Sequence, residues 1–154
     1  MFSGLGLYPF IGSKSAFLKP YSSEGQEALY QQAMLFWNKL DSVSFLFPLI
    51  FVIVGGIIAW YYYMPFNNTP HRHYKPKYWW IMMAVCAVLC FLLTLGVAVV
   101  CAPPKIEGTK VLELKLALSN MLYSVIVYGF VSLVWCNWRR AKTNAYRYLK
   151  IKFL

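Results

Sequence analysis

Three long runs of apolar residues constrain the fold of this sequence more than any other feature. They extend over residues 43–64, 78–101 and 116–138. Each run reaches the roughly 20 residues that an α-helix needs to cross the hydrocarbon core of a bilayer. Because backbone groups in lipid must form hydrogen bonds within their own segment, we predict one transmembrane helix for each run. The sequence therefore predicts an all-α integral membrane protein with three transmembrane helices.

The composition supports a membrane protein. Of the 154 residues, 60% are hydrophobic and 13% are charged, whereas soluble domains are nearer half apolar and about a quarter charged. We divide the chain into an N-terminal non-cytoplasmic segment (1–42), a three-helix transmembrane domain (43–138) and a basic cytoplasmic tail (139–154). The tail is compatible with a helix that continues the third span.

An amphipathic helix is expected just before the first span, over residues 23–40. Ser23 and Gln26 have the spacing of a capping box at its start. Apolar residues then recur at helical spacing: Leu29, Ala33, Phe36, Trp37 and Leu40. We predict that this helix lies along the membrane surface before the chain turns inward.

The lysines and arginines predict the orientation of the three spans. The tail carries six of them and the loop between the first two spans carries three, whereas the two segments on the other side carry six in all. All five acidic residues lie on that second side. The positive-inside rule then places the N-terminus outside and the C-terminus inside. We expect a location in the bacterial inner (cytoplasmic) membrane.

Basic and aromatic residues gather where the spans meet the proposed cytoplasmic face. Tryptophans at membrane boundaries and cations beside them are typical contacts for anionic phospholipid headgroups. We predict this anchoring role for Arg72, Lys75, Lys77, Trp79, Trp80, Trp138, Arg139 and Arg140. Juxtamembrane cations usually face lipid, so we expect no nucleic-acid partner.

The loop between the first two spans contains the only two histidines of the sequence, His71 and His73. They are weak candidates for a metal or haem site. No Asp, Glu or Cys lies near them in sequence, so a zinc site would need ligands from another chain. We favour the headgroup-anchoring role for this loop and expect neither a metal nor a cofactor.

Small and polar residues within the spans are candidates for helix packing. Glycine lets helix backbones approach closely, and intramembrane amides and hydroxyls form hydrogen bonds between helices. The candidates are Gly55, Gly56, Ala59, Asn120, Ser124 and Gly129. Asn120 is the strongest candidate for a buried polar contact. Part of this set is expected to hold the three helices together, and part to face another subunit.

The spans lack the side chains that transport or catalysis would need. No Asp, Glu, Lys, Arg or His occurs in residues 43–64, 78–101 or 116–138. Proton relays, ion pathways and voltage sensors depend on such residues. The sequence also has no P-loop, nucleophile elbow or HExxH motif. These features argue against an enzyme and against a self-sufficient transporter.

The function expected from the sequence is that of a non-catalytic membrane subunit. Such a subunit would anchor, scaffold or help to assemble a larger membrane or envelope complex, such as a secretion or injection machine. Its partners would be other membrane subunits, in one or several copies, and anionic phospholipids. The alternative is a small membrane protein that binds a lipid, quinone or haem between its helices within an electron-transfer or transport assembly.

Overall fold

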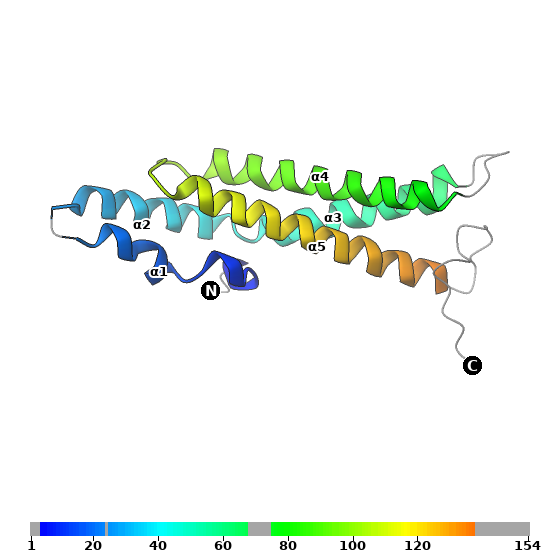
Figure 1. The fold of residues 1–154 in the computed structure, drawn as a ribbon, viewed down its shortest axis with the longest axis horizontal. Coiled ribbons are helices and arrows are strands. Elements are labelled where there is room, and N and C mark those ends of the chain that lie inside the picture. The colour runs from blue at the N-terminus through cyan, green and yellow to red at the C-terminus, as the bar shows by residue number, and fades with distance from the viewer. Residues whose placement is uncertain (1–3, 24, 68–74, 138–154) are drawn as a thin grey trace. The chain divides into compact units, whose positions relative to one another are not determined.

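The computed structural model describes residues 4–23, 25–67 and 75–137, and every regular element in these ranges is helical. The α-helices labelled in Figure 1 are α1 (Lys14–Leu18), α2 (Glu27–Ser42), α3 (Leu46–Tyr61), α4 (Pro76–Cys101) and α5 (Thr109–Asn137). The shorter turns are η1 (Gly4–Leu7), η2 (Pro9–Ile11), η3 (Lys19–Tyr21) and the π-helical η4 (Tyr62–Phe66). The predicted all-α class is confirmed for these ranges.

Three helical segments are long and apolar enough to cross a membrane, namely Leu46–Phe66, Pro76–Cys101 and Thr109–Asn137. The shortest has 21 residues, and at 1.5 Å per residue it spans about 30 Å, the thickness of a bilayer's hydrocarbon core. The three predicted spans are therefore present as helices. Their length and composition are compatible with an integral membrane protein.

The start of α2 differs from the prediction. The helix begins at Glu27 rather than Ser23, and the N-cap Gln26 makes no side-chain capping hydrogen bond. Gly25 adopts the left-handed conformation (φ +86°), which breaks the helical path between Ser23 and Gln26. The predicted capping box is therefore wrong, because its two members do not share one helical turn.

The apolar stripe of α2 packs against other parts of the chain. Ala33, Phe36, Trp37 and Leu40 are buried, whereas Leu29 is exposed. The ring of Phe17 on the neighbouring α1 lies 5.8 Å from that of Phe36 and 5.5 Å from that of Trp37, between centroids. Figure 1 shows α1 alongside α2. The placement of α2 on a membrane surface stays a prediction.

Helix α5 begins seven residues earlier than the predicted span. The first turns carry Lys110, Glu113 and Lys115, which a hydropathy boundary excludes. These turns are nevertheless helical because one face is buried, through Thr109, Leu112, Glu113 and Leu116. Hydropathy located the first residue of the apolar run, and the helix begins before that residue.

Prolines fix the other helix ends. Pro76 opens α4, where its missing amide hydrogen costs nothing, and Pro103 follows the last residue of the helix closely. Pro65 lies within η4, the wider turn that ends the first span. The side-chain amide of Asn67 donates to the backbone oxygen of Tyr62 there and so caps this turn.

The chain divides into two compact units, and each of the three long helices passes from one to the other. Unit 1 comprises Met1–Ile50 and Phe91–Asn120, and unit 2 comprises Phe51–Cys90 and Met121–Leu154. Residues 68–74 and 138–154 lie outside the described ranges. The predicted histidine loop and the predicted helical tail fall there.

Candidate packing and interface sites

A buried hydrogen-bond network surrounds Asn120 in unit 1. The Asn120 amide nitrogen donates to the backbone oxygen of Phe47 in α3, at 2.9 Å, and to the hydroxyl of Thr94 in α4, at 2.7 Å. The amide oxygen accepts a hydrogen bond from the Tyr8 hydroxyl at 2.6 Å. Because the Phe47 oxygen can only accept, this contact fixes the orientation of the amide. Asn120 therefore joins all three spans and the N-terminal segment.

The four residues of this network are shielded from solvent. Asn120, Thr94 and Phe47 have no exposed surface, and Tyr8 is 1% exposed. A buried polar group costs free energy unless it forms hydrogen bonds, so each contact offsets the burial of its partner. Asn120 lies five residues, or about 7.5 Å of helix, beyond Lys115, the last charged residue of α5 before the apolar run. The network therefore lies near one end of the spans.

The N-terminal segment packs through one side of its two 3-10 turns. Its buried residues, Leu5, Tyr8 and Ile11, recur every third position, which is the period of a 3-10 helix. The Tyr8 ring also meets the Phe47 ring edge-on, with centroids 6.4 Å apart and planes at 88°. Tyr8 thus combines an aromatic contact with a polar one, and it holds the segment against the spans.

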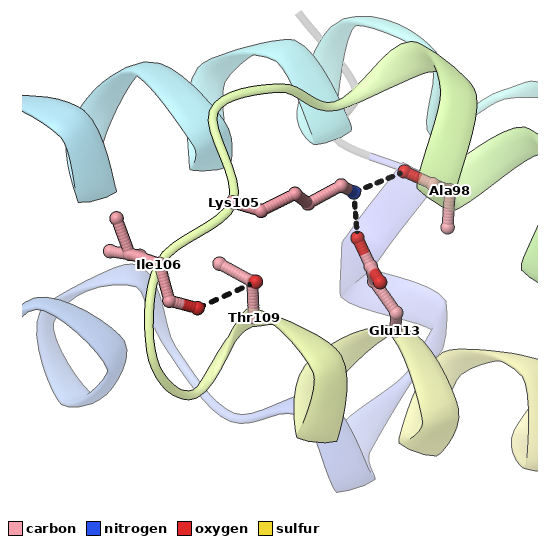
Figure 2. Close-up of polar contacts among 5 residues, drawn as sticks. All are labelled: Ala98, Lys105, Ile106, Thr109 and Glu113. Atoms are coloured by element: carbon pink, nitrogen blue, oxygen red, sulfur yellow. Dashed lines mark hydrogen bonds and ion pairs between the residues drawn. The ribbon is translucent and has the colours of Figure 1, made fainter.

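An ion pair ties the end of α4 to the start of α5. Figure 2 shows the Lys105 ammonium group donating to a carboxylate oxygen of Glu113 and, at 3.4 Å, to the backbone oxygen of Ala98. The Glu113 side chain is 4% exposed and that of Lys105 is 35% exposed. The same ammonium group lies 5.5 Å from the Phe36 ring centroid. A cation at the last turn of a helix is favourable because the free carbonyls there carry partial negative charge.

The turn that leads into α5 is fixed by two further contacts. The Thr109 hydroxyl donates to the backbone oxygen of Ile106 at 2.8 Å (Figure 2), and the Tyr21 hydroxyl donates to the backbone oxygen of Glu107. Burial, with a smaller effect from the Glu107 charge, raises the pKa of Tyr21 above its ordinary value. Gly108 has φ +87°, and a Cβ there would lie 2.9 Å from the Tyr21 oxygen. This position therefore favours glycine on two grounds.

Unit 2 is packed mainly by aromatic rings and thiols. Tyr62, Tyr63 and Cys136 form one buried cluster, in which the Cys136 thiol donates to the Tyr63 hydroxyl at 3.4 Å. The ring of Tyr63 stacks on that of Trp135, with centroids 6.3 Å apart and planes at 7°. A second buried cluster consists of Ile58, Ala59, Cys86 and Tyr128. Ala59, a predicted packing residue, therefore lies in a buried cluster of unit 2.

The three predicted packing glycines differ in their surroundings. A Cβ built on Gly55 would lie 2.9 Å from Cγ1 of Val127 in α5, so α3 and α5 approach closely there. A Cβ on Gly56 or on Gly129 would meet nothing within 4 Å. Ser124 is buried, and its hydroxyl donates to the Met121 backbone oxygen at 2.7 Å. The structure thus places Gly55 and Ser124 in internal packing and leaves the other two glycines on open faces.

The predicted headgroup anchors fall partly within the described residues. Lys75, Lys77 and Trp80 are exposed at the start of α4. Trp79 is half-buried, and its ring nitrogen donates to the Ser132 hydroxyl at 3.2 Å, so it also packs against α5. The remaining anchors (Arg72, Trp138, Arg139 and Arg140) and the weak metal candidates His71 and His73 lie outside the described ranges.

The sequence did not reveal the two side-chain partners of Asn120 (Tyr8 and Thr94) or the two members of the ion pair (Lys105 and Glu113). Thr94 carried a usable signal, because it is the only serine or threonine within its apolar run. Tyr8 carried none, since its partner lies 112 positions away. Within residues 4–23, 25–67 and 75–137, no three His, Cys, Asp or Glu side chains are grouped closely enough to hold a metal ion.

The sequence matches no known protein family, and no curated protein or solved structure matches the chain.

Proposed function

We propose that this chain is a non-catalytic membrane subunit that anchors, scaffolds or helps to assemble a larger membrane or envelope complex, such as a secretion machine. The observation that carries this proposal is the set of internal hydrogen bonds that the Asn120 side chain forms. Asn120 is the strongest polar candidate in the spans, and its amide links its own helix to the two other spans and to the N-terminal segment. Because these hydrogen bonds join segments of the chain, we assign Asn120 a structural role.

The proposed partner is a helix of another membrane subunit. Gly56 and Gly129 have open space where a side chain would lie, and large apolar side chains flank them. Ile57 is 57% exposed, and Ile126 and Phe130 are each 65% exposed. A partner helix can approach such faces closely, because glycine removes the side-chain bulk between the two backbones.

The proposed setting is the bacterial inner membrane, with the N-terminus outside and the C-terminus inside. The excess of lysine and arginine in the tail and first loop supports this orientation. Lys75 and Lys77 are exposed beside the exposed Trp80, an arrangement suited to anionic headgroups at that boundary.

The test is extraction of the tagged full chain in a mild detergent, followed by native electrophoresis and mass spectrometry. We expect a large species with other membrane proteins in fixed stoichiometry. A matched pair of variants locates the contact: Gly56→Leu fills an open face and should dissolve the complex, whereas Gly56→Ala should preserve it. A wild-type chain that migrates alone would overturn the proposal.

A further inference from the structure

A groove on the N-terminal part of unit 1 combines a mostly apolar surface with lysine and serine side chains that could bind an anion. It has a volume of about 840 Å³ and is bordered by α1, η3 and α2. Its polar lining consists of Ser13, Lys14, Ser15, Lys19, Ser22 and Tyr30. Among the residues that the structure describes, no acidic side chain lines it, so the charge of this described lining comes from the two lysines.

The hydrogen bonds already present leave donors for a ligand. The Lys14 ammonium group donates to the Asn38 side chain at 2.9 Å, which orients it and leaves two of its three hydrogens. The hydroxyls of Ser13 and Ser15 share a hydrogen bond of 2.9 Å, and Ser13 also accepts from the Ala16 amide. One hydroxyl hydrogen of this pair is thus available. The Ser22 hydroxyl donates to the Lys19 backbone oxygen and is already engaged as a donor.

The lining also has an apolar part, formed by Ala16, the buried Leu18 and the ring of Tyr30. The groove therefore offers cations and hydroxyls beside carbon surface. A phosphodiester on a glycerol backbone has the matching chemistry, because its charged oxygens adjoin hydrocarbon. Phosphate oxygens also form the strong, charge-assisted hydrogen bonds that ammonium groups favour.

We propose that this groove binds a phosphate group, held by Lys14 and Lys19, and that the phosphate belongs to the headgroup of an anionic phospholipid. The headgroup source rests on the membrane insertion within the proposed function. The phosphate chemistry does not depend on it, nor on any partner subunit. The groove precedes the first span in the chain, and none of its lining residues is among the predicted anchors on the first loop and tail.

The test measures phospholipid binding to the purified full chain in a neutral detergent by native mass spectrometry. Phosphatidylglycerol and phosphatidylcholine are titrated in parallel, and inorganic phosphate is titrated by calorimetry. We expect saturable binding of phosphatidylglycerol that the double variant Lys14→Gln/Lys19→Gln weakens about tenfold or more, as loss of charge-assisted hydrogen bonds implies.

The matched control is the double variant Lys39→Gln/Lys110→Gln, which removes the same charge from exposed positions outside the groove. It should leave the affinity within about twofold of wild type, because it removes no direct contact. A circular-dichroism melt of each variant verifies that the fold is kept. Tyr30→Phe removes one hydroxyl and should weaken binding less than the lysine pair does.

The two sources of phosphate give different results. Lysine-dependent binding of phosphatidylglycerol supports the headgroup, whereas lysine-dependent binding of inorganic phosphate without lipid preference supports the site and assigns it to a soluble anion. Equal losses in both double variants, or no saturable binding of either probe, would overturn the proposal. Because this readout needs no partner protein, it can fail while the subunit proposal stands, and the reverse also holds.

Discussion

The contacts within unit 1 differ in chemistry from the contacts within unit 2, although the same three helices contribute residues to both units. Unit 1 is organised by polar contacts, namely the Asn120 network between distant segments and the local Lys105–Glu113 ion pair. Unit 2 is organised by stacked rings, thiols and the close approach at Gly55. The difference therefore arises from which side chains each stretch carries rather than from the type of helix.

This contrast indicates two ways of holding transmembrane helices together. Lipid tails are as apolar as leucine, so burial in a membrane does little to bring helices together, and close packing or hydrogen bonding must do so. A hydrogen-bond network selects one register, because an amide finds its partners at a single position. Ring and glycine packing instead depends on shape and tolerates conservative changes.

Replacing Asn120 with alanine should have the largest effect, and it tests whether polar contacts stabilise unit 1. The variant removes three hydrogen bonds and leaves the buried Tyr8 and Thr94 hydroxyls without their Asn120 contacts. We expect a loss of about 2–3 kcal/mol in the free energy of unfolding, measured by titration with a denaturing detergent.

Asn137 provides the control for that variant on the same helix. Its side-chain amide donates to the Leu133 backbone oxygen from an exposed position. Asn137→Ala should therefore cost less than about 0.5 kcal/mol. Equal losses at the two asparagines would mean that the network contributes no more than an exposed side chain.

Adding a methyl group to Gly55 should have the next largest effect, and it tests whether close helix packing stabilises unit 2. The new Cβ would lie 2.9 Å from Cγ1 of Val127, a β-branched side chain with few accessible rotamers. We expect Gly55→Ala to cost about 1–2 kcal/mol, as overpacking usually does. The adjacent Gly56→Ala meets open space and should be neutral or slightly stabilising in the isolated chain.

The double variant Gly55→Ala/Val127→Ala sharpens this test. Shortening Val127 removes the clashing methyl group, so most of the loss should be recovered. Failure of the second substitution to restore any stability would show that the two helices do not approach each other at this point.

Neutralising Lys105 should have the smallest effect of the three. Lys105→Met removes the partner of a nearly buried carboxylate, but the lysine itself is about one-third exposed and its charge is partly screened. We expect a loss of about 1 kcal/mol that shrinks in high salt. Lys110→Met, an exposed lysine on the first turn of α5, should show neither the loss nor the salt dependence.

Hydropathy was sufficient to predict the spans, because each long helix is built around a nearly uncharged run. It was not sufficient for the start of α5, where Thr109 and Leu112 extend the helix through a charged stretch by burying one face. The start of α2 was missed because the left-handed Gly25 separates Ser23 from the helix. Tertiary packing thus decided the start of α5, whereas a local glycine conformation decided the start of α2.

The same limit applies to the sites. Asn120 stood out because an amide in an apolar run needs partners, but the sequence did not identify them. The segment around Tyr8 is too short to show an α-helical pattern of apolar residues in the sequence. Only the fold brings Tyr8 to Asn120. Gly55 and Gly56 were equivalent in sequence, and the position of Val127 distinguishes them.

The most direct test of this account is a double-mutant cycle between Tyr8 and Asn120. Tyr8→Phe deletes only the hydroxyl, Asn120→Ala deletes the amide, and the double variant removes both groups. We expect a coupling energy of about 0.6–1.7 kcal/mol in the free energy of unfolding, typical of hydrogen bonds inside membrane proteins. Strictly additive losses would contradict it, since they would mean that the N-terminal segment does not reach Asn120.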